Sequence, residues 1–533
     1  MSNTVARLAA LSPERRKLFE QRLRGSSLPM IPKHATRDHL PLSFAQQRLW
    51  FLDQLVPGNP FYNIPGALKL VFPLNVDVFR RCLNEIVRRH ESLRTTFAMA
   101  EGVPVQIIAP ELILDLPVTD LRHLPQNLRD AEALRYATEE ARMPFDLGKG
   151  PLIRSKLLQL DTHEYVFLLT IHHIVSDGWS MGIFFQELDL LYAAFATGQP
   201  SPLRELPIQY ADFALWQREW MQGEVLEKQL SYWQGQLEGI PTLDLPTDHA
   251  RPSMPTFRGD TCPFTAPLEL MQRLKDLSGE CDATLFMTLI AAFHALLHRY
   301  TGQDVIAVGS PVANRNRPDI EGLIGFFVNS LILRADFDTN PSFRSLLVQV
   351  RQTAIGAYAN QDLPFEMLVE QLQPERDLSR NPLFQVIFQL MNAPTLAGQA
   401  APASTTPAMN VQVGTSKFDL NITMFEAADG LVGSFEFNTD LFDLSTIQRL
   451  VAHYQILLES VAANPDRHVA EVSILTPEER RRILVDWNAT QAVYPAERSL
   501  AELFEEQAAK WPQSVAVSYG QRELNYSELN AKA

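Results

Sequence analysis

The feature that most constrains the fold is a continuous apolar run, YVFLLTI, at residues 165–171. It has the length of a strand and no polar face, so it predicts a strand that is buried on both sides. The segment IHHIVSDGWS (171–180) follows, and GIFFQELDLLYAAF (182–195) then carries apolar residues at helical spacing. The sequence therefore predicts a buried strand, a short polar junction and a helix in succession.

The alternation of strands and helices occurs twice along the chain. In the first half, FRRCLNEIVRRH (79–90) has one apolar helical face. In the second half, TLFMTLIAAFHALLHRY (284–300) predicts a helix capped by Thr284, and DVIAVGSP (304–311) predicts a strand. Two such sets predict two α/β lobes. We place them at residues 38–216 and 217–465, with the connection between them at about 217–262.

Both ends of the chain differ from these lobes. SPERRKLFEQRL (12–23) predicts a helix capped by Ser12, so we interpret residues 1–37 as a linker or a docking helix for an upstream protein. After Leu475 the pattern changes again, and the chain stops inside a predicted helix. We interpret residues 466–533 as a linker and the truncated start of another domain.

Composition disfavours several classes of function. The formal net charge of -15 disfavours a nucleic-acid partner, because the phosphate backbone would be repelled. The 3 cysteines are widely spaced, so they predict neither a disulfide framework nor a zinc ribbon and fit a reducing compartment. No apolar run approaches the ~20 residues that cross a bilayer, and the first residues do not resemble a secretory signal. We expect a cytoplasmic protein that binds neither membranes nor nucleic acids.

The junction between the predicted strand and helix is the candidate site. It contains His172, His173, Asp177 and Gly178. Histidine exchanges protons near neutral pH, and a helix start offers free backbone N–H groups. The residues alone leave three alternatives open: histidines that are merely satisfied in the core, a metal site, and an acylating triad. Neighbouring histidines on a strand point to opposite faces, which disfavours a metal site, and no GxSxG segment supplies a nucleophile.

A family resemblance decides between these alternatives. HHIVSDG (172–178) resembles the HHxxxDG signature of the condensation domains of nonribosomal peptide synthetases. Relatives such as the chloramphenicol and dihydrolipoyl acyltransferases share a shorter HxxxD form. Six further segments resemble the family's other motifs, in the family's order: SFAQQRLWFL (43–52), RHESLRTTF (89–97), YADFALWQ (210–217), IGFFVNS (324–330), NQDLPFE (360–366) and RDLSRNPL (376–383). The resemblance covers roughly residues 38–465.

The resemblance implies a fold of two chloramphenicol-acetyltransferase-like lobes, which form a V-shaped pseudodimer with a central tunnel. It implies peptide bond formation, in which the α-amine of an acceptor aminoacyl thioester attacks a donor acyl thioester. Both substrates hang from phosphopantetheine arms, so we expect no cofactor bound covalently to this chain and no metal. The implied partners are a donor and an acceptor carrier domain, one at each mouth of the tunnel.

The resemblance also implies roles for the junction residues. His173 is expected where the two substrates meet, as a general base or as the group that holds the amine. His172 is expected to point the other way and to support the junction. Asp177 is expected to brace it through an ion pair with Arg315. Gly178 is expected either to offer its N–H to the developing oxyanion or to form a tight turn.

Other residues match family motifs outside the junction. Arg94 is the second candidate partner for the aspartate. Arg89, Arg94 and Trp216 are expected to hold their lobe together by packing and ion pairing. Asn329 and Asn360 lie in motifs near the expected lobe interface, where contact with substrate is an alternative to a structural role.

The end of the chain resembles the linker and opening of an adenylation domain. The segments that carry this resemblance are LVDWNAT, LAELFEEQAAKWPQSVAV and LNYSELN. The nucleotide-binding loop of such a domain and the GGxS serine of a carrier are absent, so this chain is expected neither to activate an amino acid nor to carry a thioester. A downstream adenylation domain of the same synthetase is the expected third partner.

The subtype and two other functions remain open at this point. HHIVSDGWSMG is most similar to condensation domains that take an L-configured donor and an L-configured acceptor. One alternative is a catalytically inactive condensation-like module that recruits a partner enzyme. The other is a stand-alone acyltransferase that uses a soluble acyl carrier.

Overall fold

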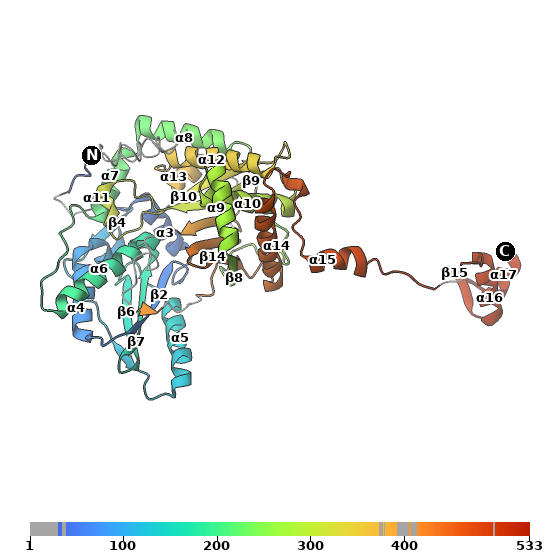
Figure 1. Cartoon of the computed structure of the whole chain (residues 1–533), viewed down its shortest axis with the longest axis horizontal. Helices are drawn as coiled ribbons and strands as arrows, with labels where there is room; N and C mark the ends of the chain where they lie inside the picture. Colours follow the sequence, from blue (N-terminus) through green and yellow to red (C-terminus); the bar gives the residue numbers. More distant parts are fainter. Residues whose placement is uncertain are drawn as a thin grey trace. The chain divides into compact units, whose positions relative to one another are not determined.

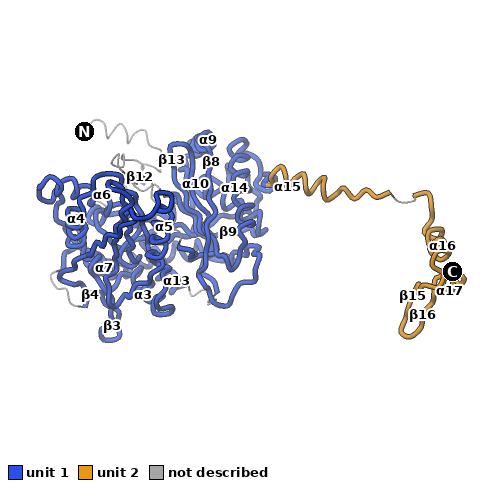
Figure 2. Tube along the Cα trace, turned by 90° about the horizontal axis from the view of Figure 1, so that it is seen from below, with its two compact units in different colours: residues 1–474 blue, residues 475–533 orange. Residues whose placement is uncertain are grey.

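The computed structural model describes residues 30–34, 39–372, 377, 379–391, 405–406, 413–493 and 496–533. The predicted helix at 12–23 lies outside the described residues, as do Arg376 and Leu378 of the segment RDLSRNPL. The chain forms two compact units, Met1–Ile474 and Leu475–Ala533, which Figure 2 shows in different colours. The candidate site lies in the first unit.

The first lobe is built on a five-stranded sheet (Figure 1). Its strands lie in the order β12 (Thr405–Thr406), β2 (Asn63–Val71), β7 (Glu164–His172), β6 (Ile153–Asp161) and β5 (Val118–Asp120). The predicted apolar run forms β7, which pairs antiparallel with β2 on one side and β6 on the other. Every residue from Tyr165 to His172 is buried.

Helices cover both faces of this sheet, which explains the continuous apolar run. Phe167 and Leu169 of β7 join the cluster that also contains the buried faces of α4 (Val76–Arg89) and α6 (Gly178–Ala196). Val166 and Leu168 point to the opposite face and join the cluster formed with α5 (Gln126–Arg142). A strand covered in this way has no solvent-facing side, so alternation with polar residues is not needed.

The second lobe contains a six-stranded sheet. Its order is β10 (Asn329–Asp336), β9 (Val305–Val312), β11 (Val386–Met391), β13 (Leu420–Ala427), β14 (Gly430–Asn438) and β8 (Gly259–Pro267). Four helices pack in its core: α9 (Leu268–Glu280), α10 (Leu285–Thr301), α12 (Phe343–Ala359) and α14 (Leu444–Ala463). Thr284 caps α10 by accepting the Met287 N–H at 3.3 Å, as predicted. The expected architecture of two α/β lobes is confirmed.

Shorter elements connect and cover the two sheets. β1 (Leu40–Pro41), β4 (Val103–Ile108) and β3 (Thr95–Ala100) form a small separate sheet. The helices outside the two cores are α3 (Phe44–Leu55), α7 (Tyr210–Trp220), α8 (Gly223–Leu237), α11 (Pro318–Glu321) and α13 (Phe365–Leu372). Helix α7 is continuous through residues 216 and 217, where we placed the border between the lobes.

Residues 320–327 pack against the first half of the chain. Ile324 lies in the core cluster of the first lobe. Phe327 packs against Tyr210 and Phe213 of α7, with ring centroids 4.9 and 4.7 Å apart respectively. A segment that belongs by sequence to the second half therefore completes the packing of the first.

The second unit is small. It contains α15 (Pro477–Arg481), a π-helical turn (Arg482–Asp486), α16 (Leu500–Lys510), an antiparallel pair of strands, β15 (Val515–Tyr519) and β16 (Arg522–Asn525), and α17 (Tyr526–Lys532). Across the described part of the chain, no single helix has the length and apolar character to cross a membrane. The bent pair α9 and α10 passes that test only when taken together, and both helices pack in the core of the second lobe.

Candidate active site

The candidate site lies where β7 passes into α6. The strand ends at His172, a short 3-10 turn spans His173–Val175, and α6 begins at Gly178. The first turn of α6 thus lies ahead of the predicted helical segment 182–195. The reason is that the Asp177 carboxylate accepts the Ser180 N–H at 2.8 Å and acts as the N-cap.

The hydrogen bonds of His173 fix its tautomer. Its Nδ1 lies 2.9 Å from the carbonyl oxygen of Ser176. A carbonyl oxygen only accepts, so Nδ1 must carry the proton and donate it. In the neutral ring Nε2 then keeps its lone pair, and Nε2 has no hydrogen-bond partner among the described residues. The backbone N–H of His173 donates to the Tyr62 carbonyl at 2.7 Å, which anchors the residue to the segment before β2.

The surroundings of His173 favour the neutral ring. Burial, with a smaller contribution from the positive charge of Lys417, lowers the pKa of His173 to about 4, and the negative charge of Asp177 acts in the opposite direction. The ring packs edge-on against Phe326, with centroids 4.9 Å apart. At neutral pH the imidazole is therefore uncharged and able to accept a proton at Nε2.

His172 occupies a different environment from its neighbour. Its side chain is buried, and its Nδ1 accepts the Ile174 N–H at 3.2 Å. Its ring packs edge-on against Phe145, with centroids 6.0 Å apart. Burial lowers the pKa of His172 to about 3. This side chain shapes the turn after β7.

Asp177 is fully buried, and both of its carboxylate oxygens are occupied. Oδ1 accepts from Ser180 N and from the Arg315 guanidinium at 3.3 Å, and Oδ2 accepts the Phe327 N–H at 3.0 Å. Among our two candidate partners, Arg315 is the one that reaches it. A carboxylate with every oxygen engaged by fixed donors is suited to bracing a loop rather than to transferring a proton.

Arg315 ties the start of α6 to residues 320–325. It donates to the carbonyl oxygens of Ile320 and Leu323 at 2.8 and 2.7 Å, and to Ser180 Oγ at 2.7 Å. Ser180 Oγ in turn donates to the Gly325 carbonyl at 2.9 Å. Arg315 Nε is buried without a hydrogen-bond partner. The turn that carries His173 is thereby fixed to the motif IGFFVNS.

Gly178 is exposed at the first position of α6. Its φ does not lie in the left-handed region, so a tight turn does not account for the glycine. A Cβ added here would meet Met391 Cε at 3.5 Å, an ordinary contact with the end of β11. The Gly178 N–H belongs to the first helical turn, where amides lack an intrahelical acceptor. A role toward an oxyanion stays a prediction.

Arg89 and Arg94 form contacts inside the first lobe. Arg89 pairs with Glu187 of α6 at 3.1 Å, and His90 Nε2 lies 3.0 Å from the same carboxylate. Arg94 donates to the Ala109 carbonyl and lies 3.7 Å from Glu91. These contacts connect α4, α6 and the start of β3, which fits the packing and ion-pairing roles we expected.

The remaining predicted residues are also engaged in packing. Trp216 stacks on Trp220, with centroids 5.0 Å apart, and Arg317 lies over its ring. Asn329 donates to the carbonyl oxygens of Gln361 and Leu363 and accepts the Phe365 N–H at 3.0 Å.

Asn360 closes α12. Its Nδ2 donates to the Gly356 carbonyl at 2.9 Å, and its own carbonyl accepts the Trp233 indole N–H at 2.9 Å. Both polar atoms of the Asn329 side chain are engaged, which favours the structural alternative for Asn329, and the contacts of Asn360 close the end of α12.

A small cleft, whose lining does not include His173 itself, lies beyond Phe326. It is lined by residues before and within α3, by the 326–329 segment, and by the start of α13, including Ser43, Val328 and Glu366. Phe326 lines this cleft and packs against His173. The imidazole is half-buried. Among the residues the structure describes, no cluster of three His, Cys, Asp or Glu is suited to hold a metal ion.

Two residues near His173 were missed at the sequence level. Tyr62 precedes β2, and its ring centroid lies 6.5 Å from that of His173. Lys417 precedes β13 and places Nζ 4.5 Å from the Tyr62 centroid. Neither lies in a segment that carries a motif, and the two residues are 355 positions apart in the sequence. The sequence contains no signal that would have brought them together.

Comparisons with known proteins identify the family of this chain. The family described as "Condensation domain" matches residues 36–484. One of the linear gramicidin synthase proteins of Brevibacillus parabrevis is 47% identical over 98% of this chain. Phosphinothricin tripeptide synthetase PhsC of Streptomyces viridochromogenes is 43% identical over 100% of it. The chain spans only 7% and 50% of these two proteins.

Solved structures show the same fold. The X-domain from teicoplanin biosynthesis matches 84% of this chain and 100% of its own, at 27% identity and a TM-score of 0.76. The first condensation domain of the calcium-dependent antibiotic synthetase, in complex with a substrate analogue, matches 82% of this chain and 99% of its own, at 24% identity and a TM-score of 0.69. With the family match over most of its length, this chain belongs to the condensation-domain family of nonribosomal peptide synthetases.

Proposed function

We propose that this chain forms an amide bond between two substrates held on carrier domains. The α-amine of the acceptor attacks the thioester carbonyl of the donor, the new C–N bond forms, and the C–S bond to the donor's phosphopantetheine arm breaks. The amine proton passes to His173 Nε2 and from there to the departing thiolate. The arms arrive as parts of the substrates, so this chain holds no covalent cofactor of its own.

One observation carries the proposal: His173 has one ring nitrogen anchored and the other open. The Nδ1–H bond to Ser176 directs the Nε2 lone pair away from the turn, and the lowered pKa keeps that lone pair free at neutral pH. General-base help of this kind contributes about 10²–10⁴-fold. Holding both arms in line contributes as well, because oriented reactants reach effective molarities of about 10⁵ M or more.

The test is amide formation between two carriers loaded with an acetyl-L-aminoacyl donor and an L-aminoacyl acceptor, followed by mass spectrometry. His173→Ala is expected to reduce the rate of amide formation at least about 100-fold. His123→Ala is a matched control, because the exposed His123 makes the same Nδ1 contact to a carbonyl, that of Asp120, at 2.9 Å. Equal product from wild type and His173→Ala would refute the catalytic assignment.

The two alternatives predict different outcomes of the same assay. A recruiting module would form no amide in any variant yet would bind a partner enzyme. The complex of the teicoplanin X-domain with OxyB is among the structures that match, with a TM-score of 0.73. A stand-alone acyltransferase would use a soluble acyl thioester as well as it uses a loaded carrier. The open Nε2 of His173 favours amide formation over recruitment alone.

We further propose that residues 466–533 are a linker and the truncated start of an adenylation domain. The match to the gramicidin synthase protein extends over 98% of this chain, beyond the 36–484 range of the condensation family. The structure of a four-domain nonribosomal peptide synthetase matches 92% of this chain in fold, with a TM-score of 0.79. We also propose that the chain takes an L-configured donor and an L-configured acceptor, and that it is cytoplasmic. Donors with L- and D-configured termini, compared in the amide assay, test the subtype.

A further inference from the structure

The segment 324–327 packs against His173, because the Phe326 ring lies edge-on against the imidazole, with centroids 4.9 Å apart. Side chains of the first lobe hold the backbone of this segment. Asp177 and Ser180, at the start of α6, bind its later part. Attachment at that end alone would leave the segment able to pivot, so the contacts of its beginning also decide where the Phe326 ring lies.

The beginning of the segment is held by His90. The Ile324 N–H donates to His90 Nδ1 at 3.2 Å, so Nδ1 has no proton and Nε2 carries it. Nε2 lies 3.0 Å from the Glu187 carboxylate and donates to it. The side chain is 1% exposed, and burial lowers the pKa of His90 although Glu187 acts in the opposite direction, which favours the neutral ring. The two ring nitrogens therefore connect Glu187 to Ile324.

Glu187 is a fixed point on α6. Its carboxylate pairs with Arg89 at 3.1 Å, and both side chains are buried. Glu187 lies two turns after Ser180, which is about 10 Å along the same face of the helix. Helix α6 therefore holds the segment 324–327 at two separate points, directly from Ser180 and through His90 from Glu187. Two such points fix the orientation of the segment as well as its position.

We propose that His90 is a positioning residue, which through Ile324 holds the Phe326 ring against the His173 imidazole and so keeps the imidazole in one orientation. Its effect on catalysis rests on the proposed function, whereas its hold on the segment can be measured without any substrate. Orientation matters for the rate, because a reacting group misplaced by about 1 Å can lose about 10²-fold.

Two substitutions at position 90 separate the two hydrogen bonds. His90→Asn places its Oδ1 near the position of Nδ1, so it can accept the Ile324 N–H but is too short to reach Glu187. His90→Gln places its amide nitrogen near the position of Nε2, so it can donate to Glu187 but offers no acceptor to Ile324. Each variant loses one hydrogen bond, so a role limited to stability would affect both alike.

The first measurement needs no substrate. Diethyl pyrocarbonate acylates the unprotonated imidazole, and fragment ions in peptide mass spectrometry separate His173 from His172. At pH 7 His90→Asn is expected to match wild type, whereas in His90→Gln the acylation of His173 is expected to be at least about threefold faster, because the released segment opens more often. His294, which is 0% exposed in the core of the second lobe, reports unfolding and is expected to stay unmodified.

The second measurement is amide formation between two loaded carriers. His90→Gln is expected to lower kcat about tenfold with little change in KM, because the orientation of the imidazole changes and the surface of the protein does not. His90→Asn is expected to keep kcat within about twofold of wild type, because Ile324 is still held.

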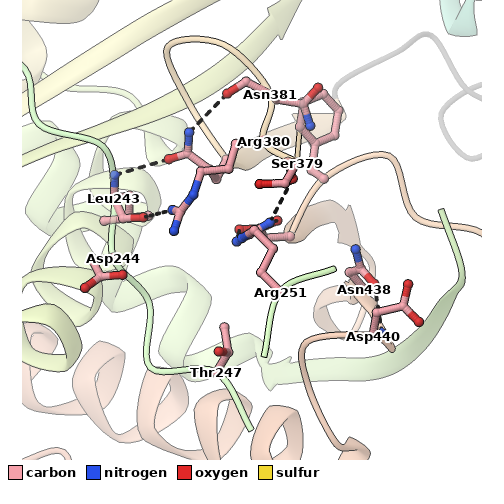
Figure 3. Close-up of polar contacts among 12 residues, drawn as sticks. Leu243, Asp244, Thr247, Arg251, Ser379, Arg380, Asn381, Asn438 and Asp440 are labelled. Atoms are coloured by element: carbon pink, nitrogen blue, oxygen red, sulfur yellow. Dashed lines mark hydrogen bonds and ion pairs between the residues drawn. The ribbon is translucent and has the colours of Figure 1, made fainter. Parts of the chain in front are cut away.

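Gln385 offers a matched control in the second lobe. Its buried side chain accepts the Leu243 N–H at 3.2 Å and donates to the Asn381 carbonyl at 3.1 Å, and Figure 3 shows both of these backbone groups. Gln385→Ala also removes a buried side chain that holds backbone groups, but these lie outside the segment 324–327. It is expected to lower stability without raising the acylation rate of His173 or lowering kcat.

The outcomes separate this inference from the proposed function. Equal acylation of His173 in His90→Asn and His90→Gln, or faster acylation in His90→Asn, would overturn the positioning role, as would a wild-type kcat in His90→Gln. A wild type that forms no amide would count against the proposed function alone, and the order of the acylation rates would still decide the role of His90.

Discussion

His173 and Asp177 lie four residues apart in one junction, yet they meet opposite conditions. Asp177 has both oxygens engaged by an arginine and two backbone amides, and it is 0% exposed. His173 is half-buried and has one nitrogen anchored and one open. A buried polar group with every hydrogen-bonding atom satisfied stabilises the fold, whereas one with an unused lone pair is available for chemistry. Within a single motif, the hydrogen bonds that a side chain already makes thus distinguish a supporting residue from one that is available to react.

The strongest way to break this comparison is to remove Asp177. Asp177→Ala is expected to lower the free energy of unfolding of the first unit by about 3–5 kcal/mol, because it leaves the Arg315 charge buried without a partner. Chemical denaturation followed by tryptophan fluorescence measures the loss. Asp120→Ala, which removes an exposed partner of Arg122, is the control and is expected to change little. A stable Asp177→Ala protein that has lost amide formation would instead make the aspartate a reacting group.

Replacing Asn329 is expected to have an effect of intermediate size on stability. Asn329→Ala is expected to cost about 1–3 kcal/mol of stability, since two backbone carbonyls and two backbone amides lose their partner. Amide formation per folded molecule is expected to stay near wild type, because the side chain is fully engaged away from His173. A rate loss above tenfold at unchanged stability would show that Asn329 contacts substrate.

The smallest expected effect is the contribution of His173 to the pH dependence of stability, which tests whether its ring is neutral in the folded chain. The pKa of His173 is lowered to about 4 in the folded chain, against about 6.5 in an unfolded one. Between these values only the unfolded state binds the proton, so stability falls as pH decreases through this window. In His173→Ala the free energy of unfolding is expected to fall less steeply as the pH decreases, by up to about 1.4 kcal/mol per pH unit. Denaturation curves at pH 5 and pH 6 measure it, and an unchanged slope would mean that the ring is protonated in the fold.

The sequence predicted those parts of the fold that depend on local pattern. The run at 165–171 and the helix at 284–300 were both predicted, because apolar spacing reports directly which faces are buried. The N-cap of α6 was not predicted, because Asp177 was interpreted only as an ion-pair partner, whereas an aspartate before a helix also caps it. The contact between Tyr62 and Lys417 was not predictable, since it depends on how two lobes pack together.

The packing of residues 320–327 bears on how this protein can be divided. Ile324 fills the interior of the first lobe, and Phe327 rests on α7 and donates its amide to Asp177. A fragment cut between residues 216 and 217 would end inside a helix and would lack the side chains that complete its own interior. The first half alone would therefore lack part of its own core, and exchanging such halves between synthetases would require residues 320–327 to be transferred with the first.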